Sequence, residues 1–264
     1  MTPEPAVVAT AADRLVTAAA TGVACGPLTD LLGSTDVALA YAVQTVVTAR
    51  RLAAGARVIG RKIGLTSEAV QRQVGVDRPD FGVLFDDMRF DSDEEIPFSR
   101  LLQPKAEAEI AFLLGSDITD PDQDVRAAVE LAFPAIEVVD SRIADWKIGI
   151  TDTVADNASS GVFVIAGDGT RLEDAAPVDA VMTMRRGDEV VSTGNGAACL
   201  GDPLNALAWL AATAIEFGDP LRAGDIVLSG ALGPMITAEP GDVFTAQIEP
   251  FGTVVARFGR KEEE

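Results

Sequence analysis

Residues 104–114 read Pro-Lys-Ala-Glu-Ala-Glu-Ile-Ala-Phe-Leu-Leu, the composition of a strand that runs into a protein core. Side chains two positions apart on a strand share one face, so Glu107 and Glu109 are expected to point the same way. Two neighbouring carboxylates at the mouth of a buried strand need a cation, a shared proton or open water. The spacing alone is equally compatible with a simpler interpretation, a strand end with two solvated acids.

A second apolar stretch, residues 134–140 (Pro-Ala-Ile-Glu-Val-Val-Asp), also carries an acid inside a predicted strand. Glu137 has an apolar neighbour on each side, and a glutamate in such a position is rarely left unpaired. It could form a salt bridge with Arg142 or Lys147. It could instead join the two acids of the first stretch as a third carboxylate ligand. Three carboxylates suit a hard cation such as Mg²⁺ or Mn²⁺ better than zinc.

Basic residues occupy another predicted strand, in residues 60–67 (Gly-Arg-Lys-Ile-Gly-Leu-Thr-Ser). Arg61 and Lys62 point to opposite faces, so one could meet a substrate carboxylate or developing charge while the other is solvated. A surface-facing basic pair explains the pattern equally well. Asp80 follows in a loop before the next strand, where it could act as a base or position a water. Ordinary turn chemistry also accounts for an Asp beside a Pro.

Two loops of small residues border predicted strands, at 156–161 (Asp-Asn-Ala-Ser-Ser-Gly) and 229–234 (Ser-Gly-Ala-Leu-Gly-Pro). Small residues permit a backbone to approach a ligand closely. Neither loop matches a phosphate-binding loop or a dinucleotide-binding fingerprint.

The whole chain has the pattern of an α+β protein, with a mainly helical N-terminal region over residues 1–75 and a β-rich catalytic domain over 76–264. Capping residues and periodicity predict helices over 4–20, 36–54, a short stretch from 66 to about 75, 122–132 and 203–217. Strands are expected near 57–63, 82–86, 106–114, 134–139, 161–166, 179–185, 189–193, 225–229, 243–248 and 253–258, with a hairpin turn at 186–188.

Composition narrows the classes of function. The 264 residues carry a net charge of −20 and are 48% hydrophobic, which allows a sizeable core and argues against a nucleic-acid binder. An acidic protein that binds an acid must place a positive charge in the site. We expect no membrane span, a cytoplasmic location, and thiols rather than a disulfide at Cys25 and Cys199. The chain contains no histidine, so catalytic triads and histidine-ligated metals are excluded.

Five segments, taken in order, resemble the 2-keto-4-pentenoate hydratases of the fumarylacetoacetate hydrolase superfamily. They are GRKIGLTS, PDFGVLFDDM, KAEAEIAFLL, PAIEVVDSRIADWKIGITDTVADNASSG and LSGALGPM, and the likeness spans about residues 35–258. The resemblance implies a mixed β-roll or barrel with an N-terminal helical region. It also implies roles for seven residues: Glu107, Glu109 and Glu137 as ligands of Mg²⁺ or Mn²⁺, Lys62 and Asp80 as catalytic residues, and Leu84 and Ser160 as substrate-binding residues.

The resemblance further implies hydration of 2-hydroxypenta-2,4-dienoate, or a close 2-hydroxy-dienoate, to 4-hydroxy-2-oxopentanoate in meta-cleavage catabolism of aromatic or related ring compounds. It implies a homo-oligomer, a pentamer or decamer, with a downstream aldolase as a further partner. One alternative is a metal-dependent decarboxylase of the 4-oxalocrotonate type. That sister group tends toward G-L-K-M-G around the lysine and has an apolar residue in place of the acid, whereas this chain has Arg61 and Asp80. An inactive structural partner is the other alternative, and the presence of all three carboxylates argues against it.

Overall fold

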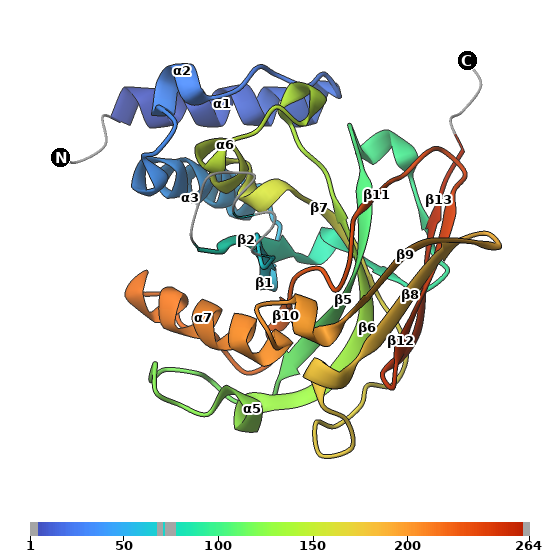
Figure 1. The fold of residues 1–264 in the computed structure, drawn as a ribbon. Coiled ribbons are helices and arrows are strands. Elements are labelled where there is room, and N and C mark those ends of the chain that lie inside the picture. Colours follow the sequence, from blue (N-terminus) through green and yellow to red (C-terminus); the bar gives the residue numbers. More distant parts are fainter. Residues whose placement is uncertain (1–4, 68–70, 72–77, 261–264) are drawn as a thin grey trace.

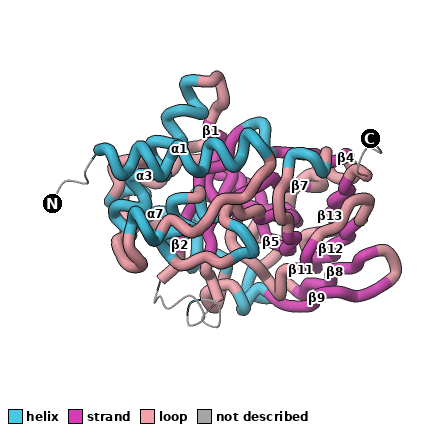
Figure 2. Tube along the Cα trace, turned by 90° about the horizontal axis from the view of Figure 1, so that it is seen from above, coloured by secondary structure: helices cyan, strands magenta, loops and turns pink. Residues whose placement is uncertain are grey.

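The structure is a computed structural model that describes residues 5–67, 71 and 78–260. Two β-sheets pack against each other, with helices gathered on one side (Figures 1 and 2). An eight-stranded sheet has the order β2-β1-β10-β5-β6-β7-β3, with β11 paired to β5, and a five-stranded sheet has the order β4-β13-β12-β8-β9. This arrangement confirms the predicted α+β class.

The first sheet is built from strands distant in sequence. Its members are β1 (Val58–Gly64), β2 (Asp80–Phe85), β3 (Arg89–Asp91), β5 (Lys105–Leu114), β6 (Val129–Val139), β7 (Ser160–Ile165), β10 (Ile226–Leu228) and β11 (Ile236–Thr237). The second contains β4 (Glu95–Ile96), β8 (Val181–Arg186), β9 (Glu189–Asn195), β12 (Val243–Glu249) and β13 (Gly252–Phe258). β1 lies in the large sheet, so that sheet contains strands from both sides of the division expected at residue 75. The division of the chain into two regions stays a prediction.

Alternation along β5 and β6 divides their side chains between two environments. Ile110 and Phe112 of β5, with Ile136 and Val138 of β6, belong to the largest apolar core, which also takes residues from the smaller sheet. The intervening residues, including the three glutamates, therefore face the opposite side of the large sheet. The strands pair antiparallel with Glu107 directly opposite Glu137.

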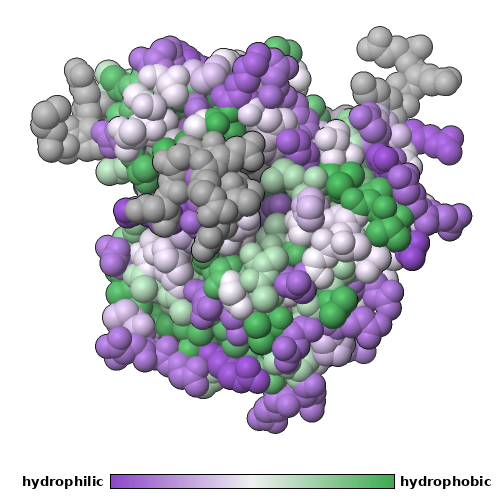
Figure 3. All heavy atoms as spheres, viewed as in Figure 1, coloured by the Kyte–Doolittle hydropathy of each residue, from purple (hydrophilic) through white to green (hydrophobic). Residues whose placement is uncertain are grey.

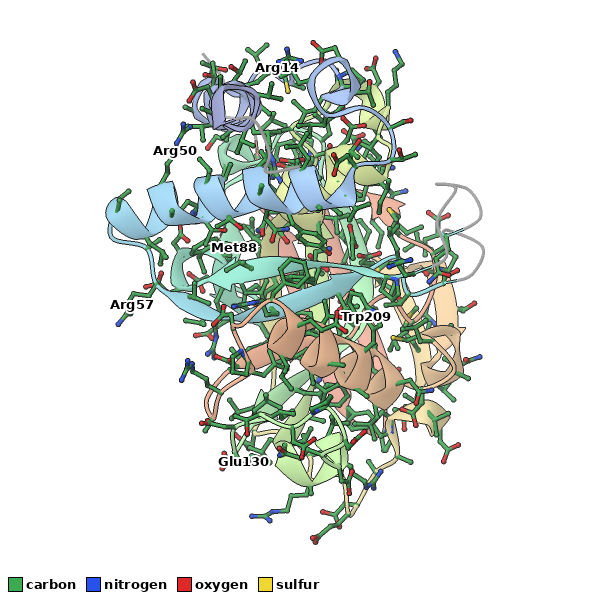
Figure 4. All side chains as sticks on the ribbon, turned by 90° about the vertical axis from the view of Figure 1, so that its left-hand side faces the viewer. Arg14, Arg50, Arg57, Met88, Glu130 and Trp209 are labelled. Carbon is green, nitrogen blue, oxygen red and sulfur yellow. The ribbon has the colours of Figure 1, made fainter. Side chains whose placement is uncertain are left out.

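The helices of one layer share a second apolar cluster. It comprises α1 (Pro5–Thr21), α2 (Thr29–Leu32), α3 (Val37–Ala53) and α6 (Ile150–Ala155). Asp36 caps α3, because its carboxylate accepts the Leu39 N–H at 2.9 Å, and the helix begins one residue later than predicted. Figure 4 shows α3 lying across β1 and β2, with α7 (Pro203–Glu216), which carries Trp209, on the far side of those strands.

One predicted helix is wrong in extent. Residues 122–132 were expected to be helical, but α5 covers only Val125–Ala128 and β6 begins at Val129. The following residues pair with β5, Leu131 opposite Leu113, so strand pairing overrides a local pattern that a helix also satisfies. The short helix expected from 66 to about 75 lies largely outside the described residues.

The surface and the most apolar helix fit the composition. Hydrophilic side chains dominate the lower and outer rim of the molecule in Figure 3, as a net charge of −20 requires. The segment Gly196–Glu216 has the length and mean hydropathy of a membrane span by composition. In the fold, its buried residues on α7, Leu207 and Leu210 among them, pack in the main core, so α7 has the environment of a core helix.

We predict that Gln44→Leu lowers the free energy of unfolding by about 2–4 kcal/mol. The buried Gln44 amide donates to the carbonyls of Phe81 and Val154, both at 2.9 Å, and so joins α3 to β2 and α6. The substitution leaves both carbonyls without this donor. Chemical denaturation measures the effect, with Thr45→Ala as the control, because exposed Thr45 bonds only within its own helix. Equal stability of the two variants would contradict the proposed joint.

Candidate active site and metal centre

Three buried carboxylates meet on the helix-facing side of the large sheet. Glu107 and Glu137 oppose each other across β5 and β6, and Glu109 lies two residues further along the same face of β5. Each offers an oxygen within 4.8 Å of the others. Glu107, Glu137 and Glu109 are only 7%, 1% and 0% exposed, respectively. The interpretation of Glu107 and Glu109 as solvated acids at a strand end is therefore wrong.

The salt-bridge partner of Glu137 is Lys62. The Lys62 Nζ lies 3.1 Å from Glu137 Oε1, and both side chains are buried. The two partners considered from the sequence are engaged elsewhere: the Arg142 guanidinium contacts Asp156 at 2.6 Å, and the Lys147 ammonium contacts an exposed aspartate. One cation therefore faces three carboxylates at this centre.

Several carboxylate oxygens at the centre have no hydrogen-bond partner within the described part of the chain. Glu109 Oε2 accepts the Gly230 N–H at 2.8 Å, whereas Glu109 Oε1 and Glu137 Oε2 are buried and accept no hydrogen bond. Buried oxygens without donors are costly. A divalent cation between them would supply the missing partner, and all-oxygen ligands are the set that hard cations prefer. The residues therefore fit such a metal.

Burial and mutual repulsion shift the titration of this cluster. Burial, with repulsion from Glu137 next, raises the pKa of Glu107 to about 7. The same two causes raise the pKa of Glu109 well above its usual value. Burial also lowers the pKa of Lys62, but attraction to Glu137 and the other carboxylates outweighs this, so the pKa of Lys62 lies above its usual value. Lys62 is therefore an ammonium ion.

Asp80 stands beside this centre, at the first position of β2. Asp80 is 1% exposed. Its Oδ2 accepts a hydrogen bond from the Thr153 hydroxyl at 3.2 Å, and its Oδ1 accepts none from a described residue. Ser159 in turn donates to the Thr153 hydroxyl at 3.3 Å. Burial raises the pKa of Asp80, opposed by Lys62 and Thr153. A buried acid whose pKa is raised in this way is a candidate for proton exchange with a ligand in the cavity.

Only glycine fits opposite Asp80. Gly64 of β1 pairs with Asp80, and a Cβ at this glycine would lie 2.2 Å from Asp80 Oδ1. The glycine of the R-K-I-G segment therefore leaves room for the carboxylate next to Lys62.

A cavity of about 580 Å³ opens over these groups. Its polar wall contains Lys62, Asp80 and Glu107, and Thr153 and Ser159 extend that wall. The remaining lining is mainly apolar and includes Leu65, Val139, Trp146, Ile148 and Met235. A cavity with a charged floor and apolar walls suits a small acid that carries a short hydrocarbon chain.

The structure places the other predicted residues differently. Leu84 lies in an apolar cluster of the large sheet, and the Ser160 hydroxyl donates to the Asn157 carbonyl at 2.8 Å. Neither lines the cavity, and their substrate-binding roles stay predictions. Arg61 is buried and forms an ion pair with Asp219, so the interpretation of Arg61 and Lys62 as a surface-facing pair is wrong.

The cavity residues that sequence reasoning missed include Thr153, Ser159 and Trp146. All three lie within the long segment that carries the family resemblance, but nothing in its local pattern separates Thr153 from the nearby Thr151. Ser159 ends the turn at residues 157–159 and Trp146 the turn at residues 144–146, both of which contain positive φ angles. Such turns are not readable from this composition.

The fumarylacetoacetate (FAA) hydrolase C-terminal family matches residues 61–259, which contain the lysine, Asp80 and all three glutamates. The chain belongs to this family. Within it, the chain is 54% identical to a TodF product hydratase of Pseudomonas putida over 95% of this chain and 94% of that protein. It is 53% identical to 2-keto-4-pentenoate hydratase 1 of Dechloromonas aromatica over 94% and 95%.

A solved family member has nearly the same fold. The 4-oxalocrotonate decarboxylase of Pseudomonas putida G7, complexed with magnesium and adipate, superposes with a TM-score of 0.93 at 34% identity, covering 97% of this chain and 99% of that one. The predicted fumarylacetoacetate hydrolase-like fold is thereby confirmed.

We predict that Mg²⁺ affinity, measured by calorimetry, rises as pH increases through about 7. Because the pKa of Glu107 is raised, this side chain in the folded, metal-free protein keeps its proton up to about pH 7. In the unfolded chain the same side chain releases its proton from about pH 4.5. The metal-free protein therefore loses stability as pH rises toward 7, and Mg²⁺ restores it increasingly over the same range.

Glu109→Gln tests the same centre, because it removes one ligand charge without changing the shape of the side chain. We expect at least tenfold weaker Mg²⁺ binding, with Glu239→Gln, at an exposed glutamate, unchanged. Full metal affinity in Glu109→Gln would show that the three glutamates are not the metal site.

Proposed function

We propose that this protein is a hydro-lyase that adds water to 2-hydroxypenta-2,4-dienoate, or a close 2-hydroxy-dienoate, and forms 4-hydroxy-2-oxopentanoate. The observation that carries the proposal is the buried Asp80 carboxylate, which lines the same cavity as Lys62 and Glu107. The names of the relatives above 50% identity support it. Such a reaction belongs to meta-cleavage catabolism of aromatic or related ring compounds.

We further propose Mg²⁺ or Mn²⁺ as the cofactor, held by Glu107, Glu109 and Glu137. The magnesium named with the decarboxylase relative supports a divalent ion at this place. When bound, such an ion supplies Lewis-acid stabilisation for negative charge on the 2-oxygen of the substrate. Lys62 holds Glu137 in place by its ion pair, and its ammonium faces the cavity, where it attracts an anionic substrate.

Asp80 is the group we assign to proton transfer. The dienol loses its hydroxyl proton and gains a proton at C5, which gives the α,β-unsaturated 2-oxo acid. Water oxygen then bonds to C4, Asp80 accepts a proton from that water, and a proton is delivered to C3. The net change is one added water. The Thr153 hydroxyl fixes one oxygen of Asp80, and the other, which is buried, accepts no hydrogen bond from a described residue.

A metal-dependent decarboxylase is the second candidate, because the decarboxylase relative shares this fold closely. Both reactions draw electrons toward the same 2-oxo group. Asp80 favours hydration, since the decarboxylase pattern has an apolar residue in that position. We also propose, from the family resemblance, a cytoplasmic homo-oligomer that passes its product to an aldolase.

The direct test is an assay of metal-stripped protein with 2-hydroxypenta-2,4-dienoate, with and without Mg²⁺ or Mn²⁺. We expect metal-dependent loss of the dienol absorbance and a product heavier by one water. Release of CO₂ from 4-oxalocrotonate, without hydration of the dienoate, would assign the protein to the decarboxylases instead.

We predict that Thr153→Val lowers kcat by about tenfold or more, with KM nearly unchanged, because Asp80 loses the donor that orients it. Thr153→Ser keeps the hydroxyl and should retain most of the activity. Steady-state kinetics measure both. Thr151→Val is the matched control, because Thr151 bonds the Gly33 carbonyl and does not line the cavity. Equal kcat in Thr153→Val and the wild type would remove Thr153 from this role.

A further inference from the structure

A second lysine lines the cavity and takes no part in the roles assigned above. Lys105 is the first residue of β5, and Lys105, Glu107 and Glu109 alternate along one face of that strand. Successive residues on this face are about 6.6 Å apart along the strand. Lys105 therefore lies one side-chain position beyond Glu107, toward the more exposed end of the face, and both residues line the cavity.

Lys105 forms no ion pair within the described part of the chain, although Glu107 on the same strand face attracts its charge. Three other cations of this region have a carboxylate partner: Lys62 pairs with Glu137, Arg61 with Asp219 and Arg142 with Asp156. Lys105 has neither an ion pair nor a hydrogen bond from Nζ to any described residue. Its Nζ lies 4.3 Å from the centroid of the Trp146 ring. An aromatic face attracts an ammonium ion but leaves its N–H groups free to donate.

The Trp146 ring beneath this ammonium is fixed in place. Its Nε1 donates to the Gln103 carbonyl at 3.0 Å, and the Gln103 side chain accepts the Asp145 N–H at 2.7 Å. Asp145 and Trp146 both have positive φ, 59° and 54°, a conformation that is unfavourable for these residues. A strained turn, anchored by hydrogen bonds, thus presents the ring to the cavity and to Lys105.

An anion must enter this cavity against a net charge of −20 and past the carboxylates of Glu107 and Asp80. Lys62 is already engaged by Glu137, so it cannot supply all of the positive charge that an incoming acid requires. Lys105 has a free charge, N–H donors and a fixed aromatic support, and it lies next to the carboxylate centre.

We propose that Lys105 binds a carboxylate group of the substrate and so selects acids for this cavity. The class of ligand, a small 2-oxo or 2-hydroxy-dienoic acid, rests on the proposed function. The carboxylate has two possible sources: the C1 carboxylate that every such acid carries, or a second carboxylate at the far end of a dicarboxylic acid.

The test uses calorimetric binding of two unreactive acids, 2-oxopentanoate and 2-oxohexanedioate, to Mg²⁺-loaded and metal-free protein. Lys105→Met keeps the length of the side chain and removes its charge, and Lys105→Arg keeps the charge. Lys147→Met is the matched control, because it removes a lysine charge from the same neighbourhood, at an exposed residue paired with Asp145.

We expect Lys105→Met to weaken binding about tenfold or more, as loss of one charge-assisted hydrogen bond implies, with a matching rise in KM and little change in kcat. Lys105→Arg should bind within about threefold of the wild type, and Lys147→Met should be unchanged. Equal losses for both acids assign Lys105 to the C1 carboxylate, whereas a loss for 2-oxohexanedioate alone assigns it to the distal one.

Unchanged binding of both acids by Lys105→Met would overturn the proposal, and so would an equal loss in Lys147→Met. Mg²⁺ affinity of Lys105→Met within about threefold of the wild type confirms that the neighbouring carboxylates are intact. Wild-type protein that binds 2-oxopentanoate through Lys105 but does not hydrate the dienoate would overturn the hydratase assignment alone, so the two proposals fail separately.

Discussion

Repulsion among three buried carboxylates is the constraint on which the rest of the site depends. Strand pairing puts Glu107 opposite Glu137, and alternation puts Glu109 on the same face. Lys62 balances one of these charges. The alternate residues of the same strands are packed in the core, so the glutamates cannot turn away without unpacking it. A cation is the arrangement that satisfies both the packing and the electrostatics.

The helical layer supplies the second half of the site. Arg142 donates to the backbone carbonyls of Asp156 and Ser160, both at 2.8 Å, and so holds the turn at residues 157–159. This turn places Ser159 so that its hydroxyl donates to the Thr153 hydroxyl. Thr153 in turn donates a hydrogen bond to Asp80. The position of the Asp80 carboxylate is therefore set by contacts between α6, the turn and β2. Precise placement of such a group governs its rate contribution.

Both charged and apolar residues line the cavity. Lys62, Asp80 and Glu107 line the cavity together with apolar residues that include Leu65, Ile148 and Met235. Charged residues of this kind can act on the 2-oxo end of a substrate, whatever the rest of that substrate contains. Relatives named as a hydratase and as a decarboxylase are both similar to this chain, and we propose that Asp80 contributes to the difference between the two reactions.

Local sequence was sufficient for most elements of the fold and for placing Glu107 and Glu109 on one strand face, whereas their predicted role as metal ligands came from the family resemblance. Alternation on β5 and β6 places Glu107 and Glu109 on one face, and capping at Asp36 and Asp202 marks the starts of α3 and α7. These features depend on neighbours within a few residues. The family resemblance added Lys62 and Asp80, which local pattern alone left ambiguous.

Tertiary structure decided what local pattern could not. Glu137 pairs with Lys62 rather than with the nearby Arg142 because two intervening strands bring β1 and β6 into one sheet. Residues 129–132 form a strand rather than a helix because β5 lies alongside them. Ser159 and Trp146 reach the cavity through turns with positive φ, and Thr153 reaches it from α6. Each outcome rests on contacts between segments far apart in the chain, whose energies exceed local preference.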